Sequence, residues 1–91
     1  MPKPAVTIEN WGVVQNVSSQ SFVELHEGNR LMGNVLGHAH LPNAKLVFTS
    51  PIVQVDLDQG VVETCNTVYR LGEASEEYKS WEYKRRASAA A

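Results

Sequence analysis

The sequence has one cysteine, Cys65, in 91 residues. A lone cysteine has no internal partner, so a small fold held together by its own disulfides is excluded. The N-terminal segment has no apolar core of a signal peptide, and no stretch approaches the roughly 18 apolar residues of a membrane span. From these absences we expect a soluble, cytoplasmic protein with no membrane partner.

Recognisable catalytic motifs are also missing. The chain contains no CxxC and no HExxH spacing. A nucleophilic cysteine needs a nearby histidine and an oxyanion hole, and the residues around Cys65 form no such motif, so we expect a buried or half-buried structural cysteine. We therefore expect a protein that is not an enzyme and that holds no cofactor.

Residues 1–73 consist of short runs rich in β-branched and aromatic residues, separated by turn residues. The runs that favour strands are 5–8, 11–14, 22–26, 30–38, 45–50, 52–57 and 61–71. Short strands at this spacing are typical of a small barrel or roll. The sequence predicts an all-β, mainly antiparallel fold: a partly open barrel or β-roll of about five to six strands.

Two glycines lie on one face of the predicted strand 30–38. Alternation places Leu31, Gly33, Val35 and Gly37 together on that face. Glycines inside a strand often mark a bend or a close approach of another backbone, as at barrel corners. We expect one of these roles for Gly33 and Gly37.

Two later strands carry further expectations. In 52–57, alternation puts Val53, Val55 and Leu57 on one face. The run 61–71 is long for a strand of this fold, and we expect a break or bulge near residues 65–66.

Residues 74–91 differ in character and predict a short C-terminal helix or tail, packed on the β domain or extending from it. Ser75 is a suitable N-cap, and Glu76 and Glu77 follow in the first turn, where the helix dipole favours acids. Tyr78 and Trp81 are three residues apart, so they can share one helical face.

Charge is divided unevenly along the chain. Residues 1–77 hold four cations and nine carboxylates, a net charge of −5, whereas residues 78–91 have a net charge of +3. An acidic body repels phosphates, which argues against a general nucleic-acid binder. The basic tail is suited to an acidic partner.

The aromatic and basic tail is the strongest candidate binding site. Tryptophan, tyrosine and arginine are enriched at protein-binding hot spots, and they also stack on nucleic-acid bases. The candidate partner-binding residues are Tyr78, Trp81, Tyr83, Lys84, Arg85 and Arg86. A plainer interpretation is that Tyr78 and Trp81 cap the open end of the barrel, leaving the cations in solvent.

His38 and His40 are the weaker candidates for a metal or catalytic site. Residues two apart in a strand share a face, so both imidazoles can point at one ion. Because Leu41 and Pro42 follow at once, we expect His40 in a turn, and the pair is more typical of a strand end. A small metal-dependent or hydrolytic enzyme using His38, His40 and Asp56 remains the alternative from a different class.

Short strings between residues 33 and 72 resemble a pattern found in uncharacterised small β-domain proteins of bacteria and phages. They are GNV at 33–35, GH at 37–38, TSPI at 49–52, VD at 55–56 and NTVYRLG at 66–72. Similar proteins often have GHP and TRN or TRS where this chain has GHA at 37–39 and TCN at 64–66. The resemblance implies a compact β domain, a mobile-element context and no particular activity.

These observations give three functional hypotheses. The leading one is a non-enzymatic protein-binding module, a phage or mobile-element factor that inhibits or adapts a protein complex in the bacterium or infected host. The alternatives are the small enzyme and a nucleic-acid-binding barrel that acts through its tail. An exposed strand edge would also allow two chains to pair as a homodimer.

Overall fold

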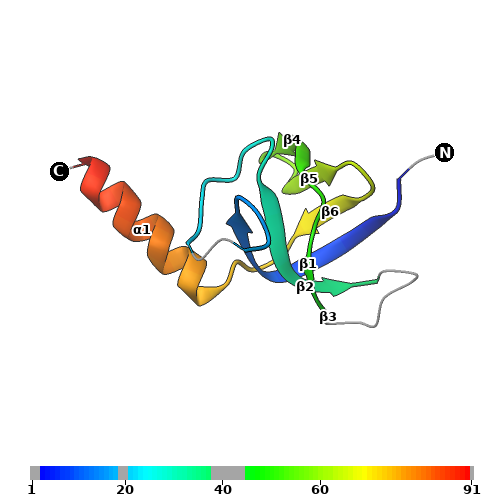
Figure 1. Cartoon of the computed structure of the whole chain (residues 1–91), viewed down its shortest axis with the longest axis horizontal. Helices are drawn as coiled ribbons and strands as arrows, with labels where there is room; N and C mark the ends of the chain where they lie inside the picture. Colours follow the sequence, from blue (N-terminus) through cyan, green and yellow to red (C-terminus); the bar gives the residue numbers. More distant parts are fainter. Residues whose placement is uncertain (1–2, 19–20, 38–44, 91) are drawn as a thin grey trace.

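The fold is a six-stranded sheet followed by one helix (Figure 1). The computed structural model describes residues 3–18, 21–37 and 45–90, with side chains up to residue 88. Its elements are β1 (Ala5–Val14), β2 (Arg30–Leu36), β3 (Lys45–Phe48), β4 (Ile52–Asp56), β5 (Val61–Thr64), β6 (Val68–Leu71) and α1 (Glu76–Ala90). The predicted all-β class with a short C-terminal helix is confirmed.

The sheet curls on itself without closing. Its strand order is β3-β2-β1-β6-β5-β4, and among the strand pairs of the described residues only β1 with β6 is parallel. At the start of β4, the Ile52 N–H donates to the carbonyl of Asn29 at 2.8 Å, and the carbonyl of Ile52 accepts from the Gly28 N–H at 2.9 Å. These bonds join the edge strand β4 to the residues just before β2, one strand in from the opposite edge, which makes a partly open barrel.

Residues 5–14 form one strand instead of the two that the sequence predicts. The register of β1 against β2 shifts between Glu9 and Gly12, and Asn10 has a positive φ of 55° within this bulge. The N–H groups of Asn10 and Trp11 both donate to the carbonyl of Glu73. The bulge separates the two apolar runs without ending the strand, which is a usual effect of an extra residue in a ladder.

The predicted strand 22–26 is absent, and this part of the prediction is wrong. One backbone bond, from the Val23 N–H to the carbonyl of Val13, ties this segment to the end of β1. Phe22, Val23 and Leu25 are half-buried and pack against the core. Their apolar character reflects coverage of the barrel end and not strand pairing.

The predictions for the two later strand segments, 52–57 and 61–71, have different outcomes. Residues 61–71 are divided into β5 and β6 near residues 65–66, as predicted. In β4, however, a register shift follows Ile52, which is buried, while Val53 and Leu57 are exposed. Val55 is half-buried against the core, but the exposure of Val53 and Leu57 contradicts the rest of the predicted apolar face of 52–57.

The core lies inside the curled sheet. Alternation along β2 is confirmed at its centre, where Leu31, Gly33 and Val35 are buried. The buried apolar cluster is Val6, Ile8, Val13, Leu31, Val35, Ile52, Val62, Tyr69 and Tyr78. Because Tyr78 belongs to α1, the start of the helix is part of the same core.

Helix α1 begins against one end of the barrel, and its later turns lead away from the sheet (Figure 1). The molecule is correspondingly elongated, with extents of 46 × 23 × 22 Å. Within residues 3–18, 21–37 and 45–90, no helix has both the length and the apolar character needed to cross a membrane.

Candidate functional site

The start of α1 is fixed to the barrel by a polar cap. The Ser75 hydroxyl accepts a hydrogen bond from the Tyr78 N–H at 3.1 Å, which is the N-cap that the sequence predicts. The Ser75 N–H in turn donates to the carbonyl of Trp11 at 2.8 Å. The first turn of the helix is thereby held in a set position at the bulged end of β1.

Four aromatic rings pack at the base of the helix. Tyr78 lies at the centre, with ring centroids 5.4 Å from Trp11, 5.3 Å from Phe22 and 5.5 Å from Trp81. The Tyr78 hydroxyl donates to the carbonyl of Val23 at 3.2 Å, and the Trp11 indole N–H donates to the carbonyl of Gly72 at 3.0 Å. We call Trp11, Phe22, Tyr78 and Trp81 the aromatic cluster.

Tyr78 is a core residue, which differs from its expected place on a partner-binding surface. Its side chain is only 2% exposed. Trp81 is half-buried beside it. The plainer interpretation from the sequence, that these two rings cap the end of the barrel, describes their positions.

Arg85 completes the cluster on its solvent side. Its guanidinium lies 5.2 Å from the centre of the Trp81 ring, and its Nη1 donates to Glu24 Oε1 at 3.1 Å. Arg85 therefore links α1 to the segment that precedes β2, through a cation–π contact and an ion pair. Its charge is partly engaged within the chain.

The remaining predicted binding residues are exposed on the outer half of α1. Tyr83 is 76% exposed, and Lys84 and Arg86 are exposed on either side of it. Arg86 lies 3.5 Å from Glu82 in a helical ion pair of the solvent-exposed kind, which contributes little to stability. The helix therefore presents a phenol and two cations to solvent.

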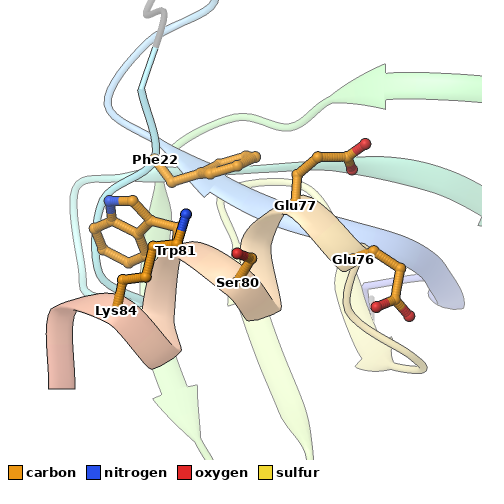
Figure 2. Close-up of a pocket in the computed structure, with 6 residues that line it drawn as sticks. All are labelled: Phe22, Glu76, Glu77, Ser80, Trp81 and Lys84. Carbon is orange, nitrogen blue, oxygen red and sulfur yellow. The ribbon is translucent and has the colours of Figure 1, made fainter. Parts of the chain in front are cut away.

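An open hollow of about 490 Å³ lies between α1 and the segment that carries Phe22 (Figure 2). The rings of Phe22 and Trp81 supply its apolar wall. Glu76 and Glu77 lie toward one end of the hollow and Lys84 lies toward the other. The lining residues are Phe22, Glu76, Glu77, Ser80, Trp81 and Lys84.

The sequence analysis did not assign Phe22, Glu76, Glu77 or Ser80 to a site. Helical spacing indicates part of this lining, because Glu77 and Trp81 are four residues apart, as are Ser80 and Lys84. The sequence gives no such indication for Phe22, since its approach to the helix depends on long-range packing.

Burial shifts the pH at which the Tyr78 phenol loses its proton. Loss of water around the phenol, with a smaller contribution from the Glu82 carboxylate, raises the pKa of Tyr78 from 10.0 to about 12. The folded state therefore favours the neutral phenol. This stabilisation is complete below pH 10 and is lost as the pH rises toward 12.

We expect the wild-type protein to lose about 1 kcal/mol of unfolding free energy per pH unit between pH 10 and 12 through Tyr78. Tyr78→Phe removes this titration, so its stability should fall less steeply over the same interval. Urea unfolding at several alkaline pH values measures the difference between the slopes, with the exposed Tyr83→Phe as a control. Parallel curves for wild type and Tyr78→Phe would contradict the expectation.

The structure describes only one of the three residues that the enzyme hypothesis uses, Asp56. His38 and His40 lie outside the described residues. Asp56 ends β4, where its Oδ1 accepts a hydrogen bond from the Gln59 N–H at 3.2 Å, as in a polar turn. Cys65 is exposed, and not buried or half-buried as expected. Within the described part of the chain, no group of three or more His, Cys, Asp or Glu residues is arranged to hold a metal ion.

Comparisons with known proteins return no matching family model, curated protein or solved structure. The resemblance to small bacterial and phage β-domain proteins therefore stays a prediction.

Proposed function

We propose that this protein is a non-enzymatic protein-binding module that uses the outer half of α1 and the hollow at its base. The observation that carries this proposal is the unequal use of the helix. Its inner face packs on the barrel through the buried Tyr78 and the half-buried Trp81, whereas Tyr83, Lys84 and Arg86 are exposed. Exposed aromatic and basic residues beside an open apolar hollow are suited to a protein contact.

The charges around the hollow define the chemistry of the partner. An apolar side chain of the partner would lie against Phe22 and Trp81. An acidic group would face Lys84, and a basic or neutral group would face Glu76 and Glu77 at the opposite end. The proposed partner thus presents an apolar residue with a carboxylate on one side.

A protein partner is favoured over nucleic acid by the charge of the helix itself. Helix α1 carries four cations and three carboxylates. Two of these carboxylates line the hollow, where they would repel phosphates. A partner that offers both signs of charge fits this surface better.

The mobile-element context belongs to the same proposal. By the resemblance at residues 33–72, such a module would act as a phage or mobile-element factor that inhibits or adapts a complex of the bacterial cytoplasm. This part rests on the resemblance and not on the geometry of α1.

Capture from a lysate of the source organism or its host tests the site, with the full chain as bait. Lys84→Glu reverses a charge at the hollow, and we expect it to reduce recovery of a specific partner about tenfold or more, since a like charge would then face the partner's carboxylate. The bound proteins are quantified by mass spectrometry.

Arg70→Glu is the matched control, because it makes the same charge change on the exposed part of β6. It should recover the partner at the wild-type level. Equal recovery by Lys84→Glu and Arg70→Glu, or no specific partner with wild-type protein, would contradict the proposal. Point variants are preferable to a chain ending at Glu77, because that truncation removes Tyr78 from the core.

A further inference from the structure

Strand β3 is an open edge of the sheet, on a surface separate from α1. It pairs with β2 on one side, and no strand of the described residues pairs with its other side. An open edge presents unpaired N–H and C=O groups that another strand can use.

The outward backbone groups of β3 belong to Leu46 and Phe48. The Thr49 N–H donates to the carbonyl of Leu31 at 2.9 Å, so Thr49 faces β2. In an antiparallel ladder the direction of the backbone groups alternates, so Val47 and Lys45 also face β2. The N–H and C=O groups of Leu46 and Phe48 therefore point away from the sheet.

The same two residues expose apolar side chains on the outer face. Leu46 is 52% exposed and Phe48 is 42% exposed. They lie opposite Asn34 and Met32 of β2, whereas Val47 lies opposite the buried Gly33. Leu46 and Phe48 thus offer hydrogen bonds at the edge and apolar surface beside it.

We propose that β3 pairs in antiparallel fashion with β3 of a second copy of this chain, about a twofold axis at Val47. In this register Leu46 of one copy forms a hydrogen-bonded pair with Phe48 of the other copy. The twofold axis repeats this pair. The edge then gains four backbone hydrogen bonds from the groups that point outward. The two Val47 residues meet at the axis.

The pattern of side chains fits a second copy in this register. Leu46 packs against Phe48 of the second copy on the outer face, and this apolar pair also occurs twice. Lys45, the charged residue of β3, lies opposite Thr49 of the second copy, so the two lysines do not face each other. Lys45 is the one charged side chain of β3 and stands at its end, so the residues at the centre of the proposed interface, Leu46, Val47 and Phe48, carry no charge that opposes such pairing.

Sedimentation of the full chain over a concentration series tests the interface. We expect a monomer–dimer equilibrium, and Leu46→Lys should weaken the dimer about tenfold or more, because the symmetry buries two added charges. Val53→Lys is the matched control on β4, the other edge strand, where Val53 is an exposed apolar residue as Leu46 is on β3. It should dimerise like wild type, and circular dichroism should show that both variants are folded.

A cross-link tests the register. In a Cys65→Ser background, Val47→Cys places two cysteines at a non-hydrogen-bonded pair, where the Cβ atoms are close enough for a disulfide. Oxidation should give a covalent dimer from Val47→Cys and little from Val53→Cys. A wild-type protein that is monomeric at all concentrations, or a dimer unaffected by Leu46→Lys, would overturn the proposal.

Discussion

Tyr78→Ala is expected to lower the free energy of unfolding by about 3 to 5 kcal/mol, as for other large-to-small changes of buried aromatic residues. Tyr78 is 2% exposed and contacts three further aromatic rings. Its removal leaves a cavity between the barrel and α1. A domain of this size has a total stability of only about 5 kcal/mol, so this variant should be close to unfolding at room temperature.

Tyr78→Phe separates packing from hydrogen bonding in this prediction. It keeps the ring and removes the hydroxyl that donates to the carbonyl of Val23, so we expect a loss of about 1 kcal/mol at neutral pH. Urea denaturation followed by circular dichroism measures both variants. A loss below 1 kcal/mol for Tyr78→Ala would mean that α1 contributes little to the cooperative core.

The importance of Tyr78 for folding shows that the residue types of the tail suit more than one role. Tyrosine and tryptophan are enriched at binding hot spots, but they also supply large buried surfaces in cores. The residue types of the tail indicate both roles and cannot decide between them. The structure places Tyr78 in the core and leaves Tyr83 exposed.

Features that depend on neighbouring residues were predictable from the sequence. The Ser75 cap, the division of residues 61–71 and the buried alternation of Leu31, Gly33 and Val35 all follow from local backbone geometry. Each involves residues only a few positions apart, so the sequence holds the necessary information.

Features that depend on distant contacts were not predictable in the same way. The parallel pairing of β1 with β6 joins residues about sixty positions apart in the chain. Phe22 lies beside α1 because the whole segment before β2 folds over the barrel end, and its apolar pattern resembles that of a strand. Hence the fold class was predictable, whereas the hollow at the helix was not.

Gly33→Ala is the second substitution for which we expect a large effect, a loss of about 1 to 3 kcal/mol or more from overpacking. A Cβ at this position would lie 2.9 Å from the Glu9 carbonyl oxygen, 2.9 Å from Ile8 Cγ1 and 3.0 Å from Trp11 Cα. Two of these atoms belong to the backbone of the β1 bulge, which cannot move without disturbing its bonds to Glu73. Close approach of another backbone, one of the two roles expected from the sequence, is thus found at Gly33.

Gly37→Ala is the control, because the sequence suggested the same roles for both glycines. Gly37 has a positive φ of 82°, and nothing lies within 4 Å of an added Cβ. Its substitution should cost only the backbone strain, about 1 kcal/mol.

Amide hydrogen exchange distinguishes the two mechanisms. Gly33→Ala should speed exchange at Asn10 and Trp11, whose N–H groups bond to Glu73, and Gly37→Ala should not. If Gly33→Ala leaves both amides protected, the bulge does not depend on the close approach of β2, and this explanation of Gly33 is wrong.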